Sequence, residues 1–375
     1  MEHVFNEHFM PFSRLPVPLM RIAEKVIAGE RINPEEGILL YEKGELGFLA
    51  MLAEQVRFRL NSDDVFFIRN FHIEPTNICV NKCRFCSYSH HFSPRKWDLT
   101  VEEMLATVVS QDRNVKEVHI TGAVHPEKDI YYYEKLFRKI KSVRPDLHIK
   151  ALSAVELEYI LNKAKVSVEQ GLKFLQAAGL DSIPGGGAEI FDEKIRQEIC
   201  ASKTSAEKWL EIHETAHRLG ITSNATMLYG HIENYGHRIS HMSLLRDSQD
   251  RFGRFNAFIP LKFRNSNNEL SGVHETSVVE DMKNYAVARI FLDNFPHLKG
   301  YWPMIGKPLA QLSLSFGVDD MDGTINDTTS IYSLAGASEQ NPRMTVSEMR
   351  ELIVQAKRNP VERDSLYQLI NSSAH

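Results

Sequence analysis

Three of the four cysteines in this chain lie within eight consecutive residues, Cys79-Val-Asn-Lys-Cys83-Arg-Phe85-Cys86. Thiolates are the ligands that hold iron–sulfur clusters in proteins. A short loop can place three thiolates around one [4Fe-4S] cubane, and the fourth iron then has no protein ligand. Because an iron with a free coordination position can bind a substrate, this spacing predicts a chemically active cluster with Cys79, Cys83 and Cys86 as its ligands.

S-adenosylmethionine (SAM) suits such an open iron, because its amino and carboxylate groups chelate a metal. The spacing Cys-x3-Cys-x2-Cys with an aromatic residue before the third cysteine resembles the signature of the radical SAM superfamily. Phe85 is that aromatic residue. We expect its ring to stack beside the cluster and the adenine.

Two other uses of the cysteines fit the sequence less well. A zinc site normally has four ligands in paired spacing, and the remaining cysteine, Cys200, is isolated and is expected to be a buried thiol. A disulfide needs an oxidising compartment, whereas the N-terminus has Glu2 and no apolar run typical of a signal peptide. We therefore expect a cytoplasmic protein with reduced thiols.

Composition narrows the possible partners. With 375 residues, 43% of them hydrophobic and 25% charged, the chain is long enough to bury a large core. No apolar run approaches the roughly 18 residues of a membrane span. A net charge of −5 without a dense Lys/Arg block argues against a nucleic-acid partner. We expect a soluble enzyme with neither a membrane nor a nucleic-acid partner.

Strand-like and helix-like segments alternate along most of the chain. Capping boxes at Thr100-x-x-Glu103 and Thr345-x-x-Glu348 predict two of the helix starts. The apolar pattern predicts further helices over 132–143, 168–178, 206–219 and 278–292. It predicts strands over 65–73, 118–122, 147–152, 183–184, 223–228, 255–261 and 298–304.

Such alternation predicts an α/β fold, a TIM-like (β/α)8 barrel of parallel strands and crossover helices. We expect an N-terminal helical extension over residues 1–62, the barrel over 63–330, and a C-terminal helical extension over 331–375 packed on the barrel.

In such barrels the chemistry lies at the carboxyl ends of the strands. The residues that follow the predicted strands are therefore candidates for the site, although each also has a structural explanation as a loop, turn or cap residue. His125 and His231 are candidates for catalysis. The candidates for cofactor binding, beside Phe85, are Ser153, Glu156, Gly185, Gly186, Gly187 and Glu189.

Four longer segments make the resemblance more specific. They are residues 72–86, 182–190 with Gly185-Gly-Gly-Ala-Glu189, 224–233 with Tyr229-Gly-His231-Ile-Glu233, and 314–324. Together they resemble the aminofutalosine synthase family of the futalosine route to menaquinone, over nearly the whole chain. One departure is visible: many superfamily members carry Gly-Gly-Glu after the second strand to hold the methionine amine, and this chain has Thr121-Gly122-Ala123.

The resemblance implies a [4Fe-4S] cluster and SAM as co-substrate. The 5′-deoxyadenosyl radical would add to 3-[(1-carboxyvinyl)oxy]benzoate, and rearrangement and decarboxylation would give aminofutalosine. A reducing electron donor such as flavodoxin or ferredoxin is implied as a partner. The dianionic substrate calls for cations or hydrogen-bond donors, for which Tyr229, His231 and Arg264 are the candidates, although Arg264 could equally be a surface residue.

Other functions stay open at this point. Within the same chemistry, the chain could be a dehypoxanthine futalosine cyclase or a deazaflavin-type enzyme, both of which abstract hydrogen. From another class, it could be an iron–sulfur electron carrier, although a carrier needs neither a barrel nor an open iron. A zinc-stabilised binding protein is the third alternative.

Overall fold

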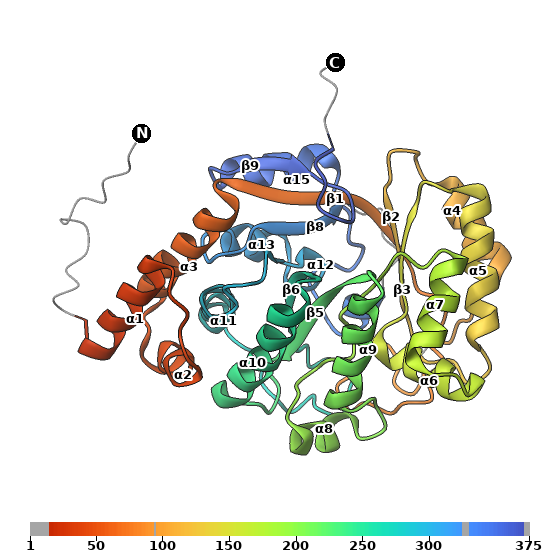
Figure 1. Ribbon diagram of the computed structural model, residues 1–375, viewed down its shortest axis with the longest axis horizontal. Coiled ribbons are helices and arrows are strands. Elements are labelled where there is room, and N and C mark those ends of the chain that lie inside the picture. The colour runs from red at the N-terminus through yellow and green to blue at the C-terminus, as the bar shows by residue number, and fades with distance from the viewer. Residues whose placement is uncertain (1–14, 94, 325–329, 371–375) are drawn as a thin grey trace.

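The computed structural model of the protein describes residues 15–93, 95–324 and 330–370. Parallel strands in the order β7-β6-β5-β4-β3-β2-β1-β8 form a barrel, and helices surround it (Figure 1). The predicted α/β class and TIM-like (β/α)8 barrel are confirmed. The barrel strands are β1 Asp64–Ile73, β2 Glu117–Ile120, β3 His148–Ala151, β4 Ser182–Ile183, β5 Thr222–Tyr229, β6 Phe255–Lys262, β7 His297–Leu298 and β8 Asp320–Thr324.

Each pair of successive barrel strands is joined through at least one helix. These helices are α4 Val101–Ser110, α5 Ile130–Val143, α6 Ala154–Ala164, α7 Val168–Ala178, α8 Glu193–Cys200, α9 Ala206–Arg218, α10 Tyr235–Phe252, α11 Val278–Phe291, α12 Trp302–Ile305 and α13 Lys307–Ser313.

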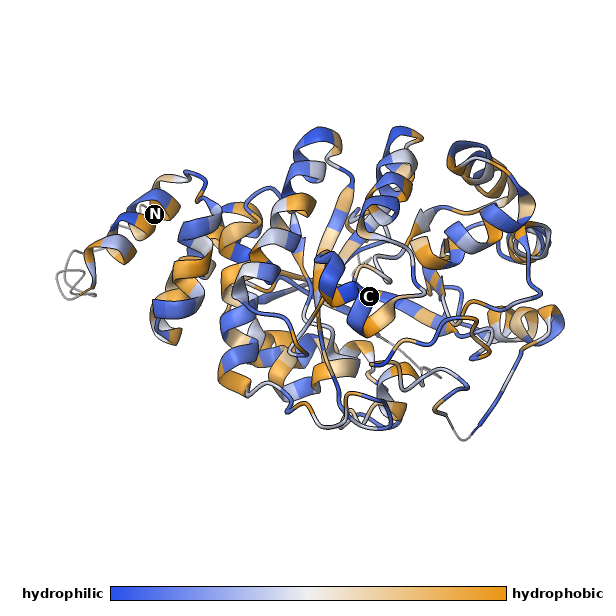
Figure 2. Cartoon of the chain, turned by 90° about the horizontal axis from the view of Figure 1, so that it is seen from below, coloured by the Kyte–Doolittle hydropathy of each residue, from blue (hydrophilic) through white to orange (hydrophobic). Residues whose placement is uncertain are grey.

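Several of the helices are amphipathic, and Figure 2 shows hydrophobic and hydrophilic residues mixed along the helices. In α5, the apolar residues Leu136, Phe137 and Ile140 are buried at helical spacing. Thr100 caps α4 through a capping box with Glu103, as the sequence predicts. Within the described residues, no helix combines the length and the apolar character that a membrane span requires.

The barrel closes between β7 and β8. Asp319 N–H donates to the Leu298 carbonyl at 3.1 Å, and Gly300 N–H donates to the Asp320 carbonyl at 2.9 Å. The predicted strand over 298–304 is wrong beyond Leu298, because α12 begins at Trp302. Pro303 lies in its first turn, where a missing N–H costs no hydrogen bond.

The N-terminal addition consists of α1 Val17–Ala28, α2 Pro34–Lys43 and α3 Leu46–Asn61. Helix α2 packs against α10 and α11, α3 packs against α11, and α1 packs on α2 and α3. The Tyr41 hydroxyl donates to Asn284 Oδ1 at 2.7 Å, and the Tyr41 ring stacks on Tyr235 with centroids 4.6 Å apart. Residues 1–14 of the predicted extension lie outside the described residues.

The C-terminal addition is only partly helical. It contains α14 Ile331–Leu334 and α15 Val346–Gln355, and α15 begins at the predicted capping box of Thr345. A further strand, β9 Asn359–Glu362, pairs in parallel with residues 64–67 of β1, beside α15 (Figure 1). The helical extension predicted for 331–375 thus also contains a strand. Strand β2 pairs only with residues 70–73 of β1, and β9 pairs with residues 64–67, nearer the start of β1.

Candidate active site

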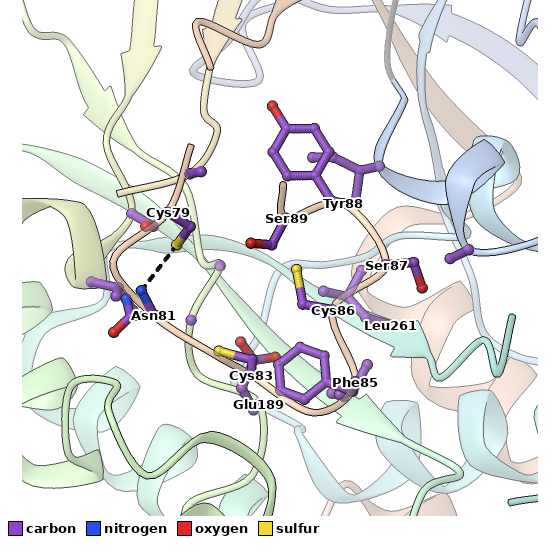
Figure 3. Close-up of a pocket in the computed structure, with 18 of the residues that line it drawn as sticks. Cys79, Asn81, Cys83, Phe85, Cys86, Ser87, Tyr88, Ser89, Glu189 and Leu261 are labelled. Atoms are coloured by element: carbon purple, nitrogen blue, oxygen red, sulfur yellow. Dashed lines mark hydrogen bonds between the residues drawn. The ribbon is translucent and has the colours of Figure 1, made fainter. Parts of the chain in front are cut away.

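The cysteine loop follows β1 at the carboxyl end of the barrel. Figure 3 shows the sulfur atoms of Cys79, Cys83 and Cys86 arranged around one open space. The Asn81 N–H donates to Cys79 Sγ at 3.4 Å, which is drawn as a dashed line in Figure 3. Within the described residues, no three His, Cys, Asp or Glu side chains converge on a point that would hold a single metal ion. Three cysteine sulfurs of one loop around an open space are consistent with a cluster held by three thiolates.

Neighbouring loops hold the backbone of the cysteine loop. Val80 N–H donates to the Val124 carbonyl after β2 at 3.0 Å. On the other side, Arg84 N–H donates to the Ile199 carbonyl of α8 at 2.9 Å. The backbone of the cysteine loop is thus held in place by two other barrel units.

Burial raises the pKa of the Cys83 and Cys86 thiols, and the Lys203 ammonium opposes that rise. Metal ligation requires the deprotonated thiolate. A lysine beside two buried thiols therefore stabilises the charged form that iron needs.

One cavity joins the cysteines to the ends of several strands. The predicted residues that line it, beside the three cysteines, are Phe85, Ser153, Gly186, Gly187, Glu189 and Arg264. Arg264 is already engaged, since its guanidinium donates to the Gly336 carbonyl at 2.7 Å and lies 3.2 Å from Glu275 Oε2.

Lys203 lines the same cavity and was not predicted. Its Nζ forms a hydrogen-bonded ion pair with Glu189 Oε1 and lies 5.2 Å from the centroid of the Phe85 ring. The side chains of the pair are only 16% and 7% exposed. Lys203 follows the end of α8 without any recognisable motif, so only the three-dimensional structure brings it beside Glu189.

Neighbouring protein atoms explain two of the three glycines in the run, and the predicted role of the run in cofactor binding stays a prediction. A Cβ at Gly185 would lie 2.6 Å from the Asn224 carbonyl oxygen. Gly187 has φ +88, and a Cβ there would overlap the Val155 side chain. Gly186 has only the Ser153 Cβ nearby, at 3.8 Å. The two outer glycines let the loop pack against β5 and α6, and the loop still borders the cavity.

Glu156 does not line the cavity but supports its wall. It forms the capping box of α6 with Ser153, and Thr121 Oγ1 donates to Glu156 Oε2 at 3.3 Å. Burial raises the pKa of Glu156 to about 7, although these hydrogen bonds oppose the rise. Glu156 thus ties the turn after β2 to the start of α6, and direct cofactor binding is not supported by its position.

Three other predicted residues lie outside the cavity linings. His125 lies 3.6 Å from Asp98 Oδ2, and its Nδ1 accepts a hydrogen bond from the Glu127 N–H at 3.1 Å. His231 lies 3.2 Å from Glu233 Oε2, and its side chain is fully buried.

Tyr229 donates to Asp281 Oδ1 of α11 at 3.0 Å. Because side chains alternate along a strand, a residue that contacts an outer helix points away from the barrel interior. All three side chains contact neighbouring loops or helices and line neither cavity, so their expected roles in catalysis and substrate binding stay predictions.

A second cavity continues from the first into the barrel, and Thr121, Gly186, Leu261, Ile331 and Tyr332 line both. Its other residues include side chains from inside five strands and from the segment after β7, namely Asn70, His72, Glu117, His119, Lys150, Asn224, Thr226, Lys299 and Asp322. Most of these residues lie within strands rather than after them, so the sequence pattern did not predict them as site residues. The available signal was the presence of ionisable residues within strands that were otherwise apolar.

Comparison with known proteins agrees with the cysteine loop and the barrel. Residues 73–245 match the Radical SAM superfamily, and residues 253–375 match the CofH/MqnC C-terminal region. The solved structure of methylornithine synthase superimposes with a TM-score of 0.71 at 18% identity, over 90% of this chain and 97% of that one, which supports the fold alone.

Two relatives share sequence over most of the chain. Aminodeoxyfutalosine synthase from Thermus thermophilus is 43% identical over 93% of this chain and 95% of its own length. Cyclic dehypoxanthine futalosine synthase from Streptomyces coelicolor is 37% identical over 93% of this chain and 88% of its own length.

Proposed function

Because the chain belongs to the radical SAM superfamily, and within it to the family that includes the aminodeoxyfutalosine synthases, we propose that it adds the 5′-deoxyadenosyl group of SAM to 3-[(1-carboxyvinyl)oxy]benzoate. The product would be aminofutalosine, with methionine and carbon dioxide released. The observation that carries this proposal is the pair of connected cavities, one beside three free cysteines and the other inside the barrel. A radical formed in the first has direct access to a molecule held in the second.

The cysteines Cys79, Cys83 and Cys86 would hold a [4Fe-4S] cluster. When bound and reduced, that cluster supplies the electron that splits SAM into methionine and a 5′-deoxyadenosyl radical. The first electron would come from a reducing partner such as flavodoxin or ferredoxin.

Side chains beside the cysteines match the polar groups of SAM. Lys203 and Glu189 present an ammonium and a carboxylate at adjacent points of the cavity. The methionine part of SAM carries a carboxylate and an amine, so Lys203 can pair with the carboxylate and Glu189 with the amine. Phe85 offers a ring for the adenine or the sulfonium. The closely packed glycine loop and the turn after β2 complete a wall that restricts water.

The bond changes conserve atoms and electrons. A new bond joins C5′ of the adenosyl group to the vinyl CH2 carbon. The aryl ring then moves from the ether oxygen to the adjacent carbon, and that oxygen becomes a ketone as the carboxylate leaves as carbon dioxide. The electron consumed in cleaving SAM is released in this decarboxylation, so no further reductant is needed for the step.

The substrate labelled with 13C in its vinyl-linked carboxylate tests this proposal. We expect one labelled carbon dioxide for each methionine formed. Methionine formation without labelled carbon dioxide would contradict radical addition.

The second candidate reaction is hydrogen abstraction, as performed by a cyclase. The 37% identity to a cyclic dehypoxanthine futalosine synthase supports this alternative. A cyclase would release no labelled carbon dioxide from this substrate.

A further inference from the structure

The second cavity ends in ionisable side chains inside the barrel. Lys150 Nζ on β3 donates to Glu117 Oε2 on β2 at 2.7 Å, and Lys299 Nζ donates to Asp322 Oδ1 on β8 at 2.5 Å. The side chains of Lys150 and Glu117 are 6% and 2% exposed. Buried ion pairs contribute little to stability because desolvation offsets their attraction. Two of them lining one cavity therefore indicate a role in recognition.

Both lysines have donors to spare. An ammonium carries three N–H donors, and among the described residues each of these two lysines makes one hydrogen bond. Burial lowers the pKa of Lys150; the charge of Glu117 opposes this fall, and the charge of Lys299 adds to it. Two cations with unused donors line this one cavity, and both can donate to an anion held there.

His119 adds a third polar group to the same cavity. Its Nε2 is buried and has no hydrogen-bond partner among the residues that the structure describes. Burial is the main cause that lowers the pKa of His119 well below its ordinary value, and the neighbouring His72 is the second cause. The His119 ring is therefore neutral at pH 7. A neutral imidazole that carries its proton on Nε2 can donate a hydrogen bond, and it does so without placing a charge in the buried site.

The rest of the cavity is apolar and aromatic. Ile259, Leu261 and Ile331 line it, together with Tyr332 and Tyr301, whose rings form an edge-to-face pair with centroids 5.3 Å apart. A ring-shaped apolar body fits this wall, and an anionic group fits the lysines beyond it.

We propose that the second cavity is the subsite for the ring carboxylate of an aromatic substrate, bound by Lys150, Lys299 and His119. This inference rests on the proposed function, because it places the benzoate end of the substrate inside the barrel. The ring would lie against Tyr332 and Leu261, which border both cavities. The vinyl group would then lie toward the cysteine loop, where the radical forms.

Three probes of one shape test the charge preference: 3-methoxybenzoate, the neutral 3-methoxybenzamide and the cationic 3-methoxybenzylamine. Their affinities are measured by calorimetry on cluster-reconstituted, SAM-loaded protein without reductant. Wild-type protein should bind the benzoate most tightly. A benzylamine that binds more tightly would assign recognition to Glu117 and Asp322 and overturn the proposal.

Variants that remove each ion pair as a unit avoid leaving a buried charge unpaired. They are Lys150→Met with Glu117→Gln, and Lys299→Met with Asp322→Asn; Asp322 has φ +62, which asparagine tolerates. Each should weaken benzoate binding about 10- to 100-fold, as loss of a charged hydrogen bond implies, with benzamide affinity nearly unchanged. Lys128→Met with Asp98→Asn removes a 2.5 Å pair outside both cavities and serves as the matched control.

The outcomes separate this inference from the proposed function. Equal weakening for benzoate and benzamide would mean that the pairs only maintain the barrel, and unchanged benzoate affinity would also overturn the inference. A wild-type enzyme that shows the charge preference but does not convert 3-[(1-carboxyvinyl)oxy]benzoate would overturn the proposed function alone.

Discussion

Replacing Lys203 tests the ion pair beside the cysteine loop. Lys203→Met leaves the Glu189 carboxylate, whose side chain is 7% exposed, without its partner. Removing one member of a buried pair costs about 3–5 kcal/mol. For 375 residues this corresponds to a fall in Tm of about 4–6 °C, from the usual unfolding entropy per residue. The double variant Lys203→Met with Glu189→Gln removes both charges and should recover most of that loss.

SAM binding separates a structural pair from a ligand-binding pair. Differential scanning calorimetry gives the two Tm values, and equilibrium dialysis of SAM against reconstituted protein gives the affinities. The double variant should fold nearly as well as the wild type and still bind SAM about 10- to 100-fold more weakly. If its SAM affinity equals that of the wild type, the pair does not contact SAM. If the single and double variants have the same Tm, the two charges are not coupled as the structure implies.

Three further outcomes are expected. Changing any one of the three loop cysteines to Ala should abolish the cluster absorbance and SAM cleavage, whereas Cys200→Ala should retain both; loss of the cluster in Cys200→Ala would refute the ligand assignment. Gly187→Ala should lower the free energy of unfolding in urea more than Gly220→Ala, because both have positive φ but only Gly187 lacks room for a Cβ; equal losses would argue against the packing explanation. Burial lowers the pKa of His213, His217 and His241, so these histidines are neutral in the folded protein and take up protons once it unfolds. The free energy of unfolding should therefore fall as the pH drops from about 6.5 to 4.5, by up to about 1.4 kcal/mol per pH unit for each histidine. A urea-denaturation profile that is flat over that range would contradict their burial.

Local patterns predicted most of the fold. Helices such as α4 and α15 begin at capping boxes, whose hydrogen bonds involve residues three positions apart and are therefore visible in sequence. Strand β9 could not be predicted, because its partner β1 lies about 300 positions earlier in the chain. The segment 298–304 is apolar enough for a strand, but its Pro303 favours a helix start.

The cysteine loop was predictable because its three thiolates are close in sequence. The rest of the site was predicted less well. Lys203 reaches Glu189 across 14 residues, and Lys150 meets Glu117 across 33. The position of a polar residue after a strand, such as that of His125, does not determine the direction of its side chain. Contacts between barrel units decide which of these residues face the cavity.

The identity of the adenosyl product tests the central claim most directly. Reconstituted protein is incubated anaerobically with dithionite, SAM and 3-[(1-carboxyvinyl)oxy]benzoate, and the products are analysed by mass spectrometry. Radical addition predicts methionine and an adenine-containing adduct that has lost the mass of carbon dioxide, with little free 5′-deoxyadenosine. Stoichiometric 5′-deoxyadenosine without that adduct would contradict radical addition and indicate hydrogen abstraction instead.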